Sequence, residues 1–280
     1  MFKQSAIASS ILKKYVVAKA MDEAKSRRWV KKNFSPSVDF MCPRKTFFDF
    51  KYSGGSHLEI DERDFSYEGM RSLYVGNKFH EFIQKQFEDA GVLVMSETTL
   101  VDEAHHIRAR LDMVIEVKST LYLVELKSAK SYSIKMMNDA NAPDMEHQKQ
   151  IQLYFHLLDV CKNDSAIYTK LQGRDVQNGL ILYENKNDHG LLEFVVNKDR
   201  VIINEILEFA NYMWKQISAN KEPKDKFDPD SFECKYKCRG QYYQMCHGRE
   251  NPAKPKVQDG NGKVWGFGSA KKSEKLDDFI

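Results

Sequence analysis

Two acidic residues and a lysine near the middle of the chain have the types and spacing of a site that binds a divalent cation and hydrolyses phosphodiesters. Asp112 lies in the stretch 107–117, and Glu125 and Lys127 lie two positions apart in the stretch 121–127. Mg²⁺ prefers oxygen ligands and is typically held by one or two carboxylates, water and substrate phosphate. It polarises the phosphoryl oxygen and activates water, while a nearby lysine neutralises developing charge. The three residues are therefore candidates for one metal-dependent site.

The residue pattern predicts that both stretches are β-strands. The odd positions from 107 to 117 are all apolar, whereas the even positions include two arginines and two acids. Side chains alternate between the faces of a strand, so Asp112 should leave the apolar face, and Glu125 and Lys127 should share a face. A hairpin can then bring Asp112 and Glu125 to one ion. An amphipathic hairpin with solvated charges is the alternative reading of this pattern alone, because charged residues make up 30% of the chain.

Two further segments carry candidate residues on predicted helices. His80 lies on the apolar face of a helix expected at 76–90, where it could be a ligand or a packed core histidine. Gln150 and Tyr154 are four positions apart on a helix expected near 144–160, so they should be neighbours on one side. The alternative for this pair is a polar face beside a tyrosine that packs in the core.

Taken together, these segments resemble RecB-like nucleases of the PD-(D/E)xK superfamily, over residues 76–158. The most similar layout is that of the CRISPR-associated, AddB-like and exonuclease V-like branches, which place a histidine on the helix before the sheet. The resemblance implies a restriction-endonuclease-like α/β core with a mixed central sheet flanked by helices. It also implies that His80, Asp112 and Glu125 ligate Mg²⁺ or Mn²⁺, with the Leu126 carbonyl as a further candidate ligand.

The resemblance assigns further roles around this ion. It makes Lys127 catalytic, together with Asp112 and Glu125, and it makes Gln150 and Tyr154 positioning residues for the active site or DNA. The expected DNA contacts beside the site are Arg108, Arg110 and Lys130. One departure is that the family often has glycine three residues before the aspartate, where this chain has Ala109.

The five cysteines provide a second set of candidate ligands. Their odd number argues against a disulfide scaffold and favours a reducing, intracellular compartment. Cys161 follows an apolar helix and is expected to be a small core thiol. One cysteine before the core and three after it is the layout of RecB-like nucleases that carry a 4Fe–4S cluster. The cysteines in this layout are Cys42, Cys234, Cys238 and Cys246.

The identity of any ion or cluster on these cysteines stays open at the level of sequence. The last three follow the spacing C-x3-C-x7-C, whereas the family usually has C-x2-C-x5-C. Four thiolates can hold an iron–sulfur cluster or a tetrahedral zinc ion. His247, next to Cys246, makes a mixed zinc site an alternative, and unligated cysteines are another. A cluster here would connect the two ends of the chain across the nuclease fold.

Composition and charge define four expected regions in the 280 residues. They are a basic helical arm (1–34), a nuclease domain (35–220), a cysteine-containing closing segment (221–250) and a flexible tail (251–280). The arm has nine Lys/Arg and two Asp/Glu, an excess of seven positive charges. These charges could contact DNA phosphates, and the alternative is a packed helix with a solvated charged face. Ser35-Pro36 is a helix-start signal before a helix and irregular connection over 37–75. Strands are expected at 92–100, 107–117, 121–127, 179–184 and 191–196, and a long helix near 199–219.

The sequence thus predicts a DNA nuclease, with exonuclease action on single-stranded or end-exposed DNA as the mode that the resemblance implies. An endonuclease of the same superfamily and a noncatalytic DNA-binding or assembly subunit are the alternatives. No apolar run approaches the roughly 20 residues that a membrane span requires. The segment Leu276-Asp-Asp-Phe-Ile280 is a candidate docking peptide for a replication or recombination protein. The protein is expected in the cytoplasm or at the nucleoid, and a virus-infected host cell is a further candidate location.

Overall fold

The structure, a computed structural model, describes residues 10–16, 18–19, 30–53, 67–224, 227–231, 234 and 240–248. The chain divides into two compact units, Met1–Phe227 and Asp228–Ile280. The boundary falls within the polar segment that follows the long helix of the first unit. The docking peptide at 276–280 and most of the predicted basic arm lie outside the described residues, although 10–16 are helical.

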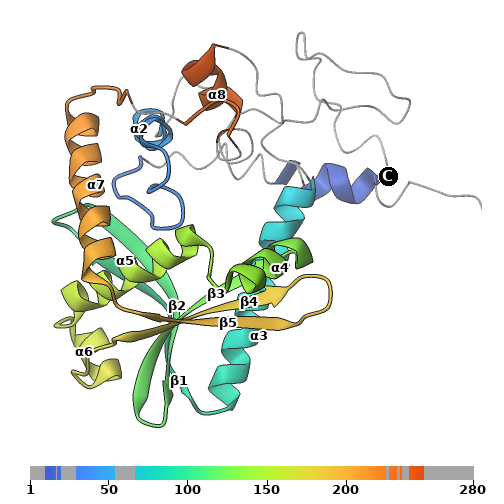
Figure 1. Ribbon diagram of the computed structural model, residues 1–280, viewed down its shortest axis with the longest axis vertical. Coiled ribbons are helices and arrows are strands. Elements are labelled where there is room, and N and C mark those ends of the chain that lie inside the picture. The colour runs from blue at the N-terminus through green and yellow to red at the C-terminus, as the bar shows by residue number, and fades with distance from the viewer. Residues whose placement is uncertain are drawn as a thin grey trace, which may run out of the picture. The chain divides into compact units, whose positions relative to one another are not determined.

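A five-stranded mixed sheet forms the centre of the first unit (Figure 1). Its strands lie in the order β1 (Leu93–Asp102), β2 (Ile107–Val117), β3 (Thr120–Ala129), β4 (Asn178–Asn185) and β5 (Leu191–Asn197). All neighbouring pairs are antiparallel except β3 and β4, which are parallel. A parallel pair needs a long crossover connection. Here the crossover contains α4 (Ser131–Ala140), α5 (Met145–Cys161) and α6 (Ser165–Leu171).

The hairpin between β2 and β3 is closed by a turn of two residues. The pair Val117 and Thr120 ends the ladder, and both turn residues, Lys118 and Ser119, have positive φ, at 49° and 64°. Two consecutive positive φ values give the turn a twist that matches the twist of the strands. The turn therefore keeps β2 and β3 in tight register.

Helices cover both faces of the sheet. From α3 (Tyr67–Asp89), Phe79 and Ile83 pack in a core cluster with residues of β2, β3 and β4, among them Leu182. Gly179 instead faces α5, because a Cβ atom there would lie 2.7 Å from Ile151 and 2.9 Å from Phe155. Since side chains alternate along a strand, positions 179 and 182 face opposite sides of β4. Thus α3 and α5 cover opposite faces, which confirms the predicted mixed sheet flanked by helices.

The helix start expected at Ser35-Pro36 is wrong. Residues 36–38 form a turn, and the first helix of this region is α2 (Pro43–Lys51), with Cys42 at its N-cap. The carboxylate of Asp39 accepts a hydrogen bond from the Ser35 backbone N–H and pairs with the Lys31 ammonium at 2.5 Å. The Asp39 side chain is buried, and its contacts stabilise residues 36–38 as a turn instead of the start of a helix. The proline signal applies at Pro43, where the missing N–H costs no helical bond.

Phe34 and the last long helix close the sheet at its β1–β2 end. Phe34 is fully buried, its N–H donates to the His106 carbonyl at 2.6 Å, and its carbonyl accepts from the Arg108 N–H at 2.9 Å. Helix α7 (Arg200–Ser218) supplies Trp214, whose ring is within 6.3 Å of the Phe34 ring. The segment before α2 thus forms part of the core of the first unit.

Other elements differ from the sequence-based expectation mainly in their limits. Helix α3 begins at Tyr67 instead of 76, and α4 and α6 were not predicted.

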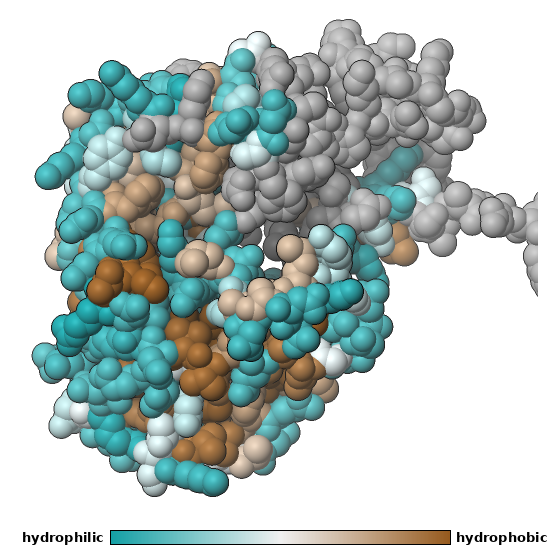
Figure 2. Space-filling view, in the orientation of Figure 1, coloured by the Kyte–Doolittle hydropathy of each residue, from teal (hydrophilic) through white to brown (hydrophobic). Residues whose placement is uncertain are grey.

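Strand β5 lies at the sheet edge and exposes Leu191 and Val195. Figure 2 shows apolar patches among polar side chains on the face of the molecule that it draws. Among the described helices, none combines the length and apolar character that a membrane span requires. In the second unit, α8 (Gly240–His247) buries Tyr243, whose hydroxyl donates to the Pro229 carbonyl.

Candidate active site

The Asp112 carboxylate lies where β2 and β3 stop pairing. The ladder between the two strands ends at Met113 and Val124, so Asp112 is the next residue beyond it. One of its oxygens, Oδ2, accepts the Leu126 backbone N–H at 2.8 Å and so replaces a ladder bond. The other, Oδ1, lies 3.4 Å from Nδ1 of His80 on α3. The side chain therefore connects both strands to the helix and keeps Oδ1 available to a ligand.

Glu125 is the most buried acid of the site, with only 1% of its surface exposed. Its Oε1 lies 2.5 Å from the Lys127 Nζ, while the buried Oε2 has no hydrogen-bond partner. Burial, and repulsion by the Asp112 carboxylate, raise the pKa of Glu125 to about 7, although the Lys127 ammonium opposes this. A buried polar atom without a hydrogen-bond partner lowers the stability of the fold by about 1–3 kcal/mol, and by more when the group is charged. A cation at Oε2 would remove this cost.

A chain of hydrogen bonds holds Lys127 in place. Its Nζ donates to Gln150 Oε1 at 3.0 Å, and Gln150 Nε2 donates to the Tyr154 hydroxyl at 2.8 Å. That hydroxyl donates to the Arg110 carbonyl of β2 at 3.2 Å. Helix α5 therefore connects to both strands of the hairpin through two side chains one turn apart. Burial, the first cause, and the charges of Glu125 and Asp112 raise the pKa of Tyr154 well above its ordinary value, so it stays neutral.

His80 responds to the same two acids. Burial alone would lower its pKa, but the hydrogen bond and charge of Asp112, together with the charge of Glu125, outweigh burial and raise it. The imidazole lies on α3 next to the buried Phe79, which anchors this part of the helix in the core. The structure thus brings together His80, Asp112, Glu125, Lys127, Gln150 and Tyr154.

Glu97 is a site residue that sequence reasoning missed. In the register of β1 and β2, Ser96 pairs with Met113 and Thr98 with Leu111, so Glu97 lies opposite Asp112. Ligand atoms of His80, Glu97 and Asp112 all lie within 4.8 Å of one another. Nothing in the polar run 96–99 distinguishes Glu97, because the strand register that places it is a tertiary feature.

The backbone of Glu97 supports a functional position. Its φ is +47°, a left-handed conformation that is uncommon for residues other than glycine, asparagine and aspartate. Its carboxylate accepts from Gln84 Nε2 at 2.7 Å and pairs with Arg110 Nε at 2.8 Å. Strained backbone of this kind clusters at functional sites, where surrounding contacts maintain it.

The donor set fits a divalent cation. His80, Glu97 and Asp112 have ligand atoms within 4.8 Å of one another, and Glu125 on β3 adds a buried Oε2 without a hydrogen-bond partner. Carboxylates suit Mg²⁺ and Mn²⁺, and imidazole is a common ligand of transition-metal ions. In a strand, the N–H and C=O of one residue point to the same side. Since the Leu126 N–H points to Asp112, the Leu126 carbonyl lies on the side of the site as well.

The three expected DNA-contacting residues are exposed. Arg108 and Arg110 lie on the exposed positions of β2, and the Arg110 side chain pairs with Glu97. Lys130 is exposed at the N-cap of α4, three residues after Lys127. Their side chains are accessible, and the role of DNA contact stays a prediction.

The cysteines are divided between the two units. Cys42 lies at the start of α2 in the first unit, whereas Cys234 and Cys246 lie in the second, and Cys238 is outside the described residues. Cys234 Sγ lies 3.0 Å from His247 Nε2, so two candidate ligands of the second unit are in contact. None of the four described cysteines is in a disulfide. Cys161 is half-buried and donates to the Val101 carbonyl at 3.4 Å.

Comparison with known proteins gives distant structural likenesses. No protein-family profile and no curated protein sequence matches the chain. The solved structure of SSO0001 is similar over 88% of this chain and 98% of its own, with 16% identity and a TM-score of 0.49. An alkaline exonuclease from Laribacter hongkongensis is similar over 68% of this chain and 90% of its own, with 13% identity and a TM-score of 0.45. A phage-related exonuclease from Haemophilus somnus 129PT is similar over 64% of this chain and 81% of its own, with 15% identity and a TM-score of 0.37.

Proposed function

We propose that the chain is a metal-dependent deoxyribonuclease of the RecB-like, PD-(D/E)xK type. The observation that carries the proposal is the buried Glu125 carboxylate, which has one oxygen on Lys127 and one without a partner, close to the Asp112 carboxylate. Burying a carboxylate next to a second acid is unfavourable unless a cation neutralises the charge. A purely structural hairpin would not need this arrangement.

The ligands we propose for Mg²⁺ or Mn²⁺ are His80, Asp112 and Glu125, with Glu97 and the Leu126 carbonyl as additional candidates. When bound, the ion supplies a Lewis acid for the phosphoryl oxygen and a means of generating hydroxide from water. Among the chain's own groups, Asp112 is oriented by the Leu126 N–H, which leaves one oxygen toward the imidazole. Glu125 is held by the Lys127 ammonium, which defines the direction of its second oxygen.

Lys127 is the proposed catalytic residue beside the scissile phosphate. Its ammonium is half-buried and bonded to both Glu125 and Gln150, so its position is set before substrate binds. A positioned cation can stabilise negative charge that develops on the phosphate in the transition state. Gln150 and Tyr154 are positioning residues, because they act on the reaction through Lys127.

The proposed substrate is DNA, and the proposed mode is exonucleolytic action on single-stranded or end-exposed DNA. Arg108, Arg110 and Lys130 supply positive charge beside the site, as contacts with phosphates require. The exonuclease mode follows from the resemblance of the motifs to RecB-like nucleases. A closed circular substrate distinguishes the alternative, since only an endonuclease can cut DNA that has no ends.

The test measures digestion of end-labelled single- and double-stranded DNA by the wild-type chain and by Lys127→Met. We expect turnover with Mg²⁺ or Mn²⁺ and none with EDTA, and a loss of at least about 100-fold in Lys127→Met, as for other charge-stabilising groups. Lys170→Met, at an exposed position of α6, is the matched control and should retain wild-type turnover. If Lys127→Met digests DNA at the wild-type rate, the proposed mechanism is wrong.

We further propose that Cys42, Cys234, Cys238 and Cys246 hold a 4Fe–4S cluster, with zinc as the alternative. The three described members are not in disulfides, and their sulfur atoms have the donor chemistry that both require. Protein purified without oxygen should be brown, with an absorbance at about 400 nm that Cys234→Ala abolishes. Colourless protein with one zinc ion per chain would reject the cluster and support the zinc site with His247.

A further inference from the structure

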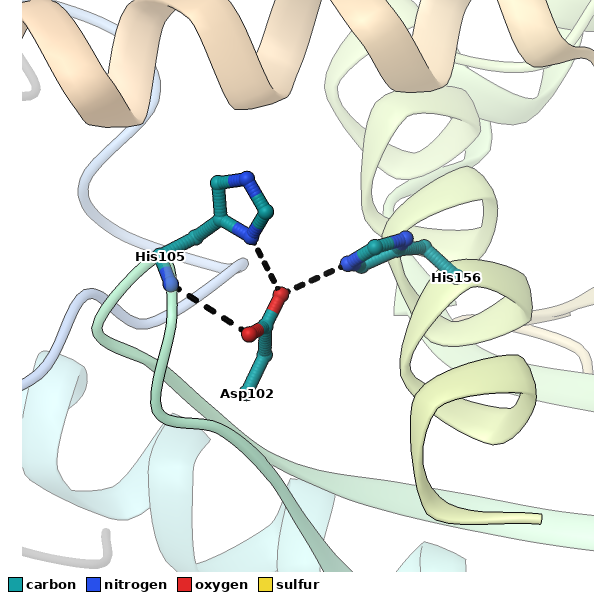
Figure 3. Close-up of side chains that lie close together, drawn as sticks. All are labelled: Asp102, His105 and His156. Atoms are coloured by element: carbon teal, nitrogen blue, oxygen red, sulfur yellow. Dashed lines mark hydrogen bonds and ion pairs between the residues drawn. The ribbon is translucent and has the colours of Figure 1, made fainter.

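A second group of potential ligands lies at the far end of the β1–β2 hairpin (Figure 3). Asp102 ends β1, His105 follows in the turn, and His156 lies on α5. His105 Nδ1 is 2.6 Å from Asp102 Oδ2, and His156 Nε2 is 2.7 Å from the same oxygen. Two imidazole nitrogens, 51 positions apart in the chain, therefore converge on one carboxylate oxygen.

The other oxygen of this carboxylate is fully occupied by backbone groups. Asp102 Oδ1 accepts the N–H of Ala104 at 3.0 Å and the N–H of His105 at 3.3 Å. The carboxylate is therefore oriented with only Oδ2 available, as in metal sites whose ligating carboxylates are held by outer hydrogen bonds. Asp102 is only 2% exposed, so this is an acid with a defined direction in the core.

The turn that carries His105 is held in place from outside the cluster. The next residue, His106, stacks on Trp214 of α7 with ring centroids 3.5 Å apart, and its carbonyl accepts the Phe34 N–H. These contacts direct His106 away from the cluster and His105 toward it. On the opposite side, helix α5 fixes His156. The positions of all three ligand atoms are thus set by packing.

The cluster is separate from the candidate active site. Asp102 is five residues beyond Glu97 along β1, roughly 17 Å at the usual rise of a strand. The side chains of His105 and His156 remain 26% and 15% exposed, so water can reach the nitrogens. Three protein ligands with access for water are the usual composition of an open zinc site.

We propose that Asp102, His105 and His156 bind a divalent transition-metal ion of the zinc class, with water completing the coordination. Their ligand atoms lie within 4.8 Å of one another. Two imidazoles favour zinc-like ions, whereas Mg²⁺ prefers oxygen ligands throughout. Each histidine would ligate the ion through the ring nitrogen that faces Asp102 and carry its proton on the other ring nitrogen. The bound ion connects the β1–β2 turn to α5, the helix that also carries Gln150 and Tyr154.

The test is a zinc count on the full-length chain with Zn²⁺ as the probe, after equilibration and removal of free ion in excess Mg²⁺. Wild-type protein should bind one Zn²⁺ per chain more than His156→Gln or His105→Gln. The comparison is a difference, so zinc held by the cysteines cancels. His189→Gln is the matched control, because His189 pairs with a single acid, Glu184, at 2.7 Å in an exposed hairpin. It should keep the wild-type zinc count, and all variants should keep Mg²⁺-dependent DNA digestion, so failure here is distinct from failure of the nuclease proposal.

A second measurement does not depend on any variant folding. In nitrogen NMR spectra of the wild-type imidazoles, one equivalent of Zn²⁺ beyond the cysteine requirement should shift the ring nitrogens of His105 and His156 and leave those of His189 unchanged. Zn²⁺ should also raise the melting temperature of the wild type more than that of His156→Gln. Equal zinc counts in wild type and both variants, or unshifted ring nitrogens, would overturn the proposal and leave a purely hydrogen-bonded cluster.

Discussion

Replacing Glu125 by glutamine should stabilise the ion-free protein while it removes the proposed activity. The Glu125 carboxylate is buried, it faces the Asp112 charge, and one of its oxygens is unpartnered. Glutamine has nearly the same shape and no charge, and its side-chain oxygen can still accept from Lys127. Residues that serve a metal ion commonly reduce the stability of the protein without that ion.

The magnitude follows from the pKa of Glu125, which is 4.5 in an ordinary exposed group and about 7 in the folded chain. Because the folded protein binds this proton more tightly than the unfolded chain, its stability falls as the pH rises from about 4.5 to about 7. Each pKa unit corresponds to about 1.4 kcal/mol, so the loss is about 3 kcal/mol and is complete above pH 7. Glutamine has no such dependence.

The assay compares thermal or urea unfolding of the wild type and Glu125→Gln in EDTA at pH 5 and pH 8. At pH 5 the two proteins should differ little. At pH 8 the variant should be more stable by up to about 3 kcal/mol, roughly 5–10 °C in melting temperature for a chain of this size. Adding Mg²⁺ should raise the melting temperature of the wild type more than that of the variant.

Two outcomes would refute this reasoning. If Glu125→Gln is less stable than the wild type at both pH values, the carboxylate contributes to the ion-free fold through its contact with Lys127 more than it costs by burial. If the stability difference is the same at pH 5 and pH 8, the pKa of Glu125 is not raised in the folded protein. Asp188→Asn, at an exposed position of the β4–β5 hairpin, is the control for a general effect of charge.

Three further substitutions test the packing that positions the site. Gly179→Ala should lower stability by about 1–3 kcal/mol in urea unfolding, because the added methyl lies 2.9 Å from the Phe155 ring, and an unchanged midpoint would contradict the close approach of α5 to β4. Tyr154→Phe should cost about 1–2 kcal/mol, since it leaves the Gln150 amide unpaired, and it should also slow DNA digestion; full activity would exclude a positioning role. Asp199→Ala should cost about 1 kcal/mol, because the Asp199 carboxylate accepts the N–H groups of residues 201 and 202 at the start of α7, and unfolding midpoints of the two proteins measure it.

The local patterns of the sequence were sufficient to predict most strands of the sheet and the helices α5 and α7. Strand β2 has the limits expected from its alternation, 107–117, and the buried positions from 107 to 115 include every odd residue. The strands of the second half and helices α5 and α7 lie within three residues of the expected limits. Alternation and helical periodicity are properties of consecutive residues, so one sequence contains them in full.

Contacts between distant segments could not be predicted from the sequence. The helix start was predicted at Pro36 rather than Pro43, because the buried pair of Asp39 and Lys31 that stabilises the turn is a tertiary contact. Helix α4 has no buried residue and α6 only two, so neither shows the periodic apolar face by which a helix is recognised.

For the candidate site, the sequence by itself determined the residue types and the strand faces of Asp112, Glu125 and Lys127. Only the tertiary structure decided that Glu97 lies opposite Asp112, that Glu125 keeps an unpartnered oxygen, and that Asp102 meets two histidines. The physical reason is that side-chain direction follows from local backbone geometry, whereas strand register, burial and the approach of a helix depend on how the whole core packs.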